Sequence, residues 1–271
     1  MTAVETVPPI TASAPLRGRQ LSVGYGERLV LEGLDVELPA GELTMIVGPN
    51  GCGKSTLLRA LARMVPVRAG SVELDGRPIG EYPTRQVARR LGLLPQSPVA
   101  PDGITVTDLV ARGRYPHQGI FRQWSDADAV AVDEAMARAG VTDLAARQVS
   151  QLSGGQRQRV WIAMALAQQT PILLLDEPTT YLDIAHQVEV LRLARSLQRD
   201  GYTIVVVLHD LHLAFRYATH LLVMKEGRIV AQGDPGAVVT AELIEDVYGL
   251  PCRVLPDPET GRPLVIPAGD E

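Results

Sequence analysis

A glycine-rich loop contains the residues best suited to chemistry. Residues 48–55 fit the spacing G-x-x-x-x-G-K-[ST], in which glycines leave backbone N–H groups free to surround phosphate oxygens. We expect Lys54 to reach the β- and γ-phosphates of a nucleotide, Ser55 to offer an oxygen to Mg²⁺ and Thr56 to bond the α-phosphate. The full set of predicted loop contacts is Gly48, Pro49, Asn50, Gly51, Cys52, Gly53, Lys54, Ser55 and Thr56.

The segments on either side of the loop support this interpretation. The run 42–47 predicts a strand, and the apolar spacing at 55–63 predicts a helix whose positive end points at the phosphates. A glycine turn at the start of an ordinary helix is the alternative. Because strand, loop and helix follow in the order that phosphate binding requires, we prefer the phosphate site.

Two consecutive carboxylates follow a second apolar run, 172–175. Asp176 is expected to hold Mg²⁺, directly or through its waters. Since successive strand residues point to opposite sides, Glu177 is placed to polarise an attacking water as a general base. Taken alone, a strand that ends in Asp-Glu is more often an ordinary surface terminus. The phosphate loop upstream favours the catalytic interpretation.

The pentapeptide Leu-Ser-Gly-Gly-Gln at 152–156, placed at a predicted helix start, offers a second anion site through a hydroxyl and backbone N–H groups. A capped helix is the alternative. The pentapeptide resembles the signature motif of the ABC ATPase family. That resemblance implies that two copies pack head to tail around two ATP molecules, with the motif facing the γ-phosphate held by the other copy. The motif residues carried over are Ser153, Gly154, Gly155 and Gln156.

Four further positions take their expected roles only from this resemblance. Gln96 resembles the Q-loop glutamine that senses Mg²⁺ and water, and His209 resembles the switch histidine that contacts the γ-phosphate and orients the general base. Tyr25 resembles the aromatic that stacks on adenine, although a surface turn tyrosine is the alternative. Asp183 resembles the D-loop aspartate of the dimer seam, and Tyr181 stands before it where many relatives have Ala.

The pattern along the chain predicts an α/β fold, and the resemblance implies a P-loop NTPase (RecA-like) core. The segment 16–38 predicts an antiparallel β region, while the runs 172–175, 204–208 and 221–224 predict buried parallel strands separated by helices such as 187–198. We expect a disordered lead-in at 1–15 and an ABC ATPase domain at 16–271. Within that domain we expect an inserted helical lobe at about 97–169 and a C-terminal extension at about 234–271. The extension is predicted to contain a short helix, 241–248, and two short strands, 253–255 and 264–266.

Composition narrows the classes of partner. The chain has 26 Lys and Arg against 31 Asp and Glu, a net charge of -5, which argues against nucleic acid as the main partner. No apolar run approaches the roughly 18 residues of a membrane span. Cys52 and Cys252 give neither metal spacing nor a disulfide framework, so a reducing cytosol fits best. We interpret Cys52 as a plain filler of the loop. The alternative is that the phosphate-binding amides and Lys54 lower its pKa, in which case alkylation is expected to abolish ATP binding unless ATP protects it.

Two other groups of residues are candidate binding sites. His209 and His212 are three apart and could bind metal, but no third ligand stands at a suitable spacing. Arg85, Arg89 and Arg90 form a basic cluster that we interpret as a solvated helix face.

Several outlying segments resemble the ATPases of ferric-siderophore importers, with cobalamin and haem importers as close relatives. These segments are 113–118, 124–126, 179–186, 252–254 and 257–264. The resemblance implies ATP hydrolysis coupled to transport, at the cytoplasmic face of the membrane, with integral permease subunits and indirectly a siderophore-binding protein. The stretch 112–124, including Arg114 and Tyr115, is expected to contact the permease, with a solvent-exposed loop as the alternative.

A soluble ABC machine for translation, DNA repair or iron–sulfur assembly is the second class of function. Translation types usually carry two tandem nucleotide units, and repair types insert long coiled coils or zinc modules before the signature motif. The chain has neither feature. Fold analogy alone keeps this class open.

Overall fold

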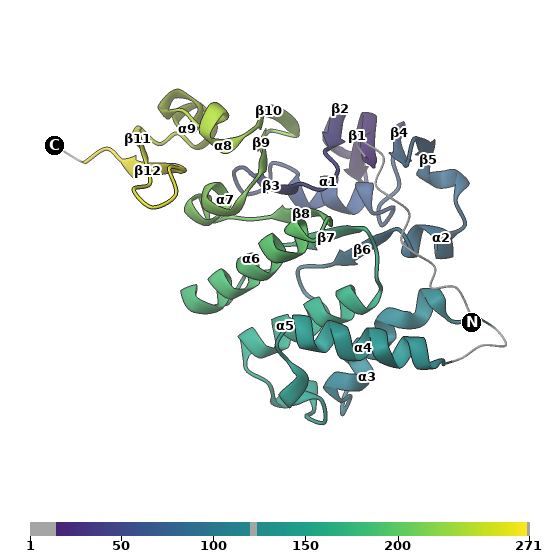
Figure 1. Cartoon of the computed structure of the whole chain (residues 1–271). Coiled ribbons are helices and arrows are strands. Elements are labelled where there is room, and N and C mark those ends of the chain that lie inside the picture. The colour runs from purple at the N-terminus through teal and green to yellow at the C-terminus, as the bar shows by residue number, and fades with distance from the viewer. Residues whose placement is uncertain (1–14, 120–123, 270–271) are drawn as a thin grey trace.

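A six-stranded sheet in the order β10-β9-β3-β8-β7-β6 forms the centre of the molecule (Figure 1). The computed structural model describes residues 15–119 and 124–269, so the predicted lead-in at 1–15 falls outside the described residues except for Pro15. Five of the strands run parallel, and β10 pairs antiparallel with β9 at one edge. The strands are β3 (Leu43–Val47), β6 (Leu91–Leu94), β7 (Ile172–Asp176), β8 (Thr203–Val207), β9 (His220–Lys225) and β10 (Arg228–Gly233).

The strand order brings distant segments to one edge of this sheet. Every residue of β3, β7 and β8 is buried, as expected for parallel strands covered on both faces. Because parallel strands all end at the same edge, the segments that follow β3, β6, β7 and β8 meet there. Those four segments contain the phosphate loop, Gln96, Glu177 and His209.

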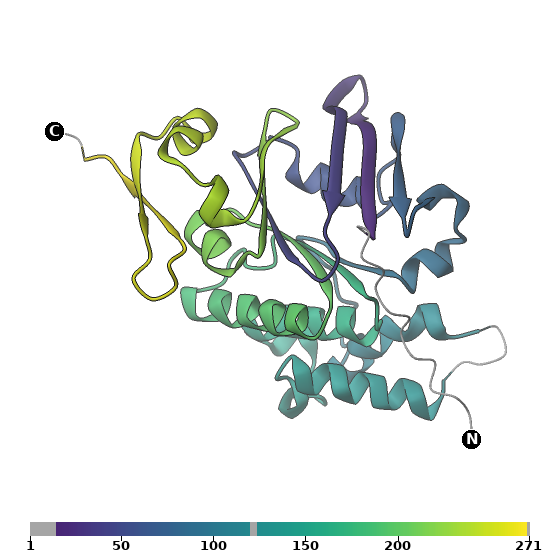
Figure 2. The same cartoon turned by 45° about the horizontal axis from the view of Figure 1, so that its top comes forward.

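Alternate residues of each central strand enter different apolar cores. Met45 packs into the core that includes α6 and α7, whereas Ile46 packs into the core that includes α1 and the antiparallel sheet. That second sheet has the order β2-β1-β4-β5 and stands beside α1 in both views (Figure 2). The elements are α1 (Lys54–Leu61), α6 (Ile184–Arg199), α7 (Leu211–Tyr217), β1 (Leu16–Tyr25), β2 (Arg28–Leu38), β4 (Ala69–Leu74) and β5 (Arg77–Pro78). The predicted α/β core and antiparallel region are confirmed.

The segment of the chain that connects β6 to β7 forms three helices, which pack together. They are α3 (Val106–Ala111), α4 (Asp126–Arg138) and α5 (Gly154–Ala167), and the 3₁₀ segments η2 (Arg112–His117), η3 (Thr142–Leu144) and η4 (Val149–Gln151) connect them. Ser125 and Ser153 each start a helix with a capping box, so both helix starts are encoded locally. Two further short elements, η1 (Ile79–Glu81) and α2 (Thr84–Ala88), lie between β5 and β6 in the chain. In the described part of the chain, no helix is long and apolar enough to cross a membrane.

The C-terminal segment folds onto α7. It contains α8 (Pro235–Val238), α9 (Ala241–Tyr248) and a hairpin of β11 (Cys252–Pro256) and β12 (Pro263–Pro267). Arg216 of α7 holds the hairpin turn through Asp257 at 2.8 Å and Glu259 at 2.7 Å. The short helix and both strands lie where the sequence predicts them.

The burial of Arg114 contradicts the expectation that its side chain contacts a permease. Its side chain is 5% exposed, and it donates to Asp128 Oδ1 at 2.9 Å, the carbonyl of Ala167 at 2.7 Å and Gln169 Oε1 at 2.9 Å. Such a residue ties η2, α4 and α5 together and has no surface to offer a permease. Its neighbour Tyr115 is 60% exposed and keeps that possibility.

We predict that Arg114→Ala destabilises the protein, because it leaves Asp128 as a buried carboxylate without its cation. Breaking such a buried pair costs about 3–5 kcal/mol of unfolding free energy. Tyr115→Ala, the matched control at an exposed position, should change it by no more than about 0.5 kcal/mol. Urea unfolding followed by circular dichroism measures both, and equal losses in the two variants would contradict the assignment.

Candidate functional site

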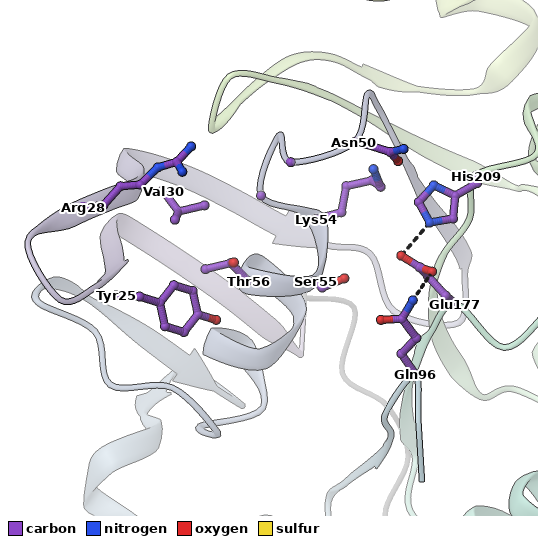
Figure 3. A pocket seen from close by; sticks show the side chains of 12 residues that line it. Tyr25, Arg28, Val30, Asn50, Lys54, Ser55, Thr56, Gln96, Glu177 and His209 are labelled. Carbon is purple, nitrogen blue, oxygen red and sulfur yellow. Dashed lines mark hydrogen bonds and ion pairs between the residues drawn. The ribbon is translucent and has the colours of Figure 1, made fainter. Parts of the chain in front are cut away.

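A pocket of about 610 Å³ lies at the carboxyl edge of the central sheet, between the phosphate loop and the β1–β2 hairpin (Figure 3). Its lining residues are Tyr25, Arg28, Val30, Asn50, Gly51, Gly53, Lys54, Ser55, Thr56, Gln96, Glu177 and His209. Tyr25, Arg28 and Val30 stand at one end of the pocket and Gln96, Glu177 and His209 at the other, with the phosphate loop between them. The structure therefore brings together most of the predicted site.

The conformation of the phosphate loop depends on its glycines. Gly48 has a φ of +151°, and a Cβ there would lie 2.2 Å from the backbone carbonyl oxygen of Met224, so no larger residue fits. Gly53 has a φ of +105° and caps the start of α1, which directs the first amides of that helix into the pocket. The ammonium of Lys54 is buried and donates to the carbonyls of Gly48 at 2.7 Å and Pro49 at 2.9 Å. The loop thus encloses its own cation.

Glu177 is held by side chains that follow two other strands. Its Oε1 lies 2.6 Å from His209 Nε2, and Gln96 Nε2 donates to its Oε2 at 2.5 Å (Figure 3). Thr180 Oγ1 donates to the same Oε2 at 3.2 Å. The backbone of Glu177 has a φ of +52°, a left-handed conformation that non-glycine residues rarely adopt and that costs about 1–3 kcal/mol. The three side-chain contacts together hold the carboxylate of Glu177 in position.

Asp176 is the last residue of β7 and contacts the phosphate loop, but it is not among the described residues that line the pocket. It is 1% exposed, accepts from Ser55 Oγ at 2.7 Å and pairs with Arg59 at 3.3 Å. Carboxylate, hydroxyl and amide oxygens of Asp176, Ser55 and Gln96 are hard donors of the kind that Mg²⁺ prefers. These residue types fit the ion that the sequence analysis expects.

Ser153, Gly154, Gly155, Gln156 and Asp183 are absent from the pocket lining among the described residues. Ser153 Oγ accepts a hydrogen bond from the backbone N–H of Gln156 at 3.3 Å and caps α5. In return, the side-chain oxygen Oε1 of Gln156 accepts from the backbone N–H of Ser153 at 3.1 Å. Asp183 caps α6 and is exposed. One chain alone does not bring these residues to its own phosphate loop.

The other two groups weighed as sites have different surroundings. His209 faces Glu177, whereas His212 lines a second pocket beside Arg216 and the C-terminal hairpin, so the two rings serve different places. Arg85 and Arg89 both donate to the carbonyl of Pro116, at 2.7 and 2.9 Å. Both residues are exposed, as expected for a solvated face, and their hydrogen bonds also connect the α2 region to η2.

Comparison with known proteins identifies the family. The family model described as "ABC transporter" matches residues 31–180, more than half of the chain. The chain belongs to the ABC transporter family.

The ferric enterobactin transport ATP-binding protein FepC of Escherichia coli is 57% identical over 94% of this chain and 95% of its own. The hemin import ATP-binding protein HmuV of Streptomyces coelicolor is 49% identical over 91% of this chain and 88% of its own. Among solved structures, an inward-facing ABC transporter of the metal-chelate type has a TM-score of 0.81 at 29% identity, covering 96% of this chain and 98% of that one.

Membership of this family implies ATP binding, and the pocket is the candidate site for it. Sequence reasoning missed Arg28 and Val30 among the lining residues. Tyr25 pairs directly with Arg28 across the β1–β2 hairpin, which puts both side chains on one face. The two-residue turn between them was the signal that could have found Arg28.

The pKa of the Cys52 thiol is raised, so the alternative of a lowered pKa is wrong. Burial is the largest influence on this thiol and raises its pKa, outweighing the lowering effect of nearby Lys54. The side chain is only 5% exposed. A reactive cysteine needs both a low pKa and access, and Cys52 of this ABC ATPase has neither.

We predict that Cys52 in the folded protein reacts slowly with iodoacetamide at pH 8. With Cys252→Ser as the background, so that one thiol reports, the rate should be at least roughly tenfold lower than in the urea-unfolded chain, because the raised pKa leaves less thiolate and burial blocks access. Mass spectrometry of timed samples gives both rates. Equal rates would mean that the thiol is neither buried nor shifted.

Proposed function

We propose that the chain is the ATP-hydrolysing subunit of an importer that takes up a ferric siderophore through a separate membrane permease. The observation that carries the catalytic part is the carboxylate of Glu177, held between His209 and Gln96 in the pocket that contains Lys54. A fixed acceptor opposite a phosphate-binding lysine is what hydrolysis of a γ-phosphate needs.

In this proposal the adenine of ATP stacks on Tyr25, and the loop amides with Lys54 hold the phosphates. Ser55, Asp176 and Gln96 would hold Mg²⁺, which neutralises charge on the phosphate oxygens. Glu177 accepts a proton from the attacking water. The close contact with His209 and the hydrogen bond from Gln96 hold its two oxygens, so the acceptor is oriented before water arrives.

A second copy of the chain completes each site. Ser153 and Gly154 are exposed at the start of α5, whereas Gln156 is half-buried and Gly155 is buried. In this proposal the hydroxyl of Ser153, the first amides of α5 and Gln156 contact the γ-phosphate bound by the other copy. Asp183 would line the seam between the copies. Closure of this homodimer on ATP moves the permease, and product release reopens it.

The likeness to the enterobactin protein supports a siderophore, and the lower identity to the hemin protein keeps haem, with cobalamin, as the alternative cargo. In either case the chain sits peripherally at the cytoplasmic face of the cell membrane. It works with permease subunits and indirectly with a siderophore-binding protein, and it has no nucleic-acid partner. A soluble, non-transport ABC ATPase is the remaining alternative, favoured by ribosome or scaffold association and disfavoured by recovery with a permease.

We predict that Glu177→Gln abolishes turnover while ATP stays bound. Loss of a general base lowers the rate by about 10²–10⁴-fold, whereas the loop that binds the phosphates is unchanged. Phosphate release measures the rate, filter binding measures ATP, and analytical ultracentrifugation is expected to find a closed dimer. Glu134→Gln, on the exposed face of α4, is the matched control. Wild-type turnover in Glu177→Gln would disprove the assignment.

We predict that deleting the gene abolishes uptake of labelled ferric siderophore and leaves cobalamin and haem uptake intact. Restoring the wild-type chain should recover transport, and restoring Glu177→Gln should not. Loss of haem or cobalamin uptake instead would change the cargo. Normal uptake of all three compounds would overturn the importer assignment.

A further inference from the structure

His186 connects two motifs that the proposed function assigns to the dimer seam. It lies in the first turn of α6, three residues after Asp183. Its backbone N–H donates to Asp183 Oδ1 at 3.0 Å, and its ring Nδ1 lies 2.7 Å from the same oxygen. The amide and then the ring hold the pKa of the Asp183 carboxyl below its ordinary value. One histidine thereby fixes the orientation of the D-loop aspartate.

The other edge of the imidazole rests on the signature motif of the same chain. A Cβ built on Gly155 would lie 2.6 Å from Cγ and 2.9 Å from Nε2 of His186, distances that real side chains do not show. Gly155 lies inside α5 and has no positive φ, so its backbone would accept alanine. The ring of His186 therefore occupies the space that a side chain at position 155 would need, and one of the two must move to accommodate it.

Gly154 provides the contrast within the same motif. A Cβ there would lie 3.8 Å from Leu182 Cδ2, an ordinary van der Waals contact. Leu182 therefore leaves room beside Gly154, whereas His186 of α6 packs closely against Gly155.

We propose that His186 is a positioning residue that joins the D-loop (residues 180–184) to the signature motif (residues 152–156), so that the two present one rigid surface to the second copy. The proposal rests on the proposed dimer. Its physical basis is that one imidazole has a hydrogen bond to Asp183 on one edge and close packing against Gly155 on the other. Two loops held in register before association lose less freedom when the dimer closes, which strengthens dimerisation without any new contact to ATP.

A thermal-unfolding cycle on the single chain without nucleotide tests the contact itself. Gly155→Ala should lower Tm by roughly 5 °C, because it forces a methyl group into the ring. Adding His186→Ala should return part of that loss, whereas Gly154→Ala should lower Tm by less than Gly155→Ala does. A double variant no more stable than Gly155→Ala would overturn the contact.

Dimerisation tests the positioning role. In the Glu177→Gln background, His186→Ala should keep affinity for a fluorescent ATP analogue within about twofold and weaken ATP-dependent dimerisation by about tenfold. His186→Asn, whose amide can still donate to Asp183, should recover part of the dimer. Dimerisation equal to that of the parent would overturn the proposal. If Glu177→Gln alone stays monomeric with ATP, the proposed dimer fails instead, and the unfolding cycle still decides whether His186 joins the two loops.

Discussion

The position of the Glu177 carboxylate depends on contacts with side chains that reach it from the two neighbouring strands. Gln96 follows β6 and His209 follows β8, while Glu177 follows β7, which lies between them. The three residues meet only because these strands are parallel neighbours and end at one edge. A strand reversed or exchanged in the sheet would separate acceptor and donors by many ångströms. The order of the central sheet is therefore the constraint on which the catalytic end of the pocket depends.

The two cores on either side of the sheet hold that order in place. Each strand sends alternate apolar side chains to each core, so a shift of one residue would exchange the two faces. The antiparallel sheet braces α1 and presents Tyr25 at the far end of the pocket. On the other side, the packed helices α3, α4 and α5 present Ser153 outward, away from the lysine of their own chain. Under the proposed function, one chain hence carries two different halves of an ATP site.

The sequence predicted the features that are local and contiguous. The phosphate loop, the run ending in Asp176 and the capped helix at Ser153 are each encoded within ten residues, and each lies in the predicted kind of element. Strands β6 and β10 were not predicted, because β6 is only four residues long with a glycine inside it and β10 lacks a continuous apolar run. Their identity as strands comes from their neighbours in the sheet.

Properties that depend on distant partners were the ones that pattern could not give. Arg114 is buried because the carbonyl of Ala167, far along the chain, accepts from it. For Cys52, charge and burial act in opposite directions on the pKa, and only the packing decides which is larger. The contact between His186 and Gly155 likewise joins segments that sequence spacing does not relate.

Complementation between two inactive chains tests most directly whether one site is shared by two copies. One chain carries Lys54→Ala and the other Ser153→Arg, so each alone forms dimers with two defective sites. In a mixed head-to-tail dimer, the intact loop of the second chain meets the intact signature motif of the first. We expect mixing to restore phosphate release that neither chain shows alone. Mixed dimers that form and remain inactive would contradict it.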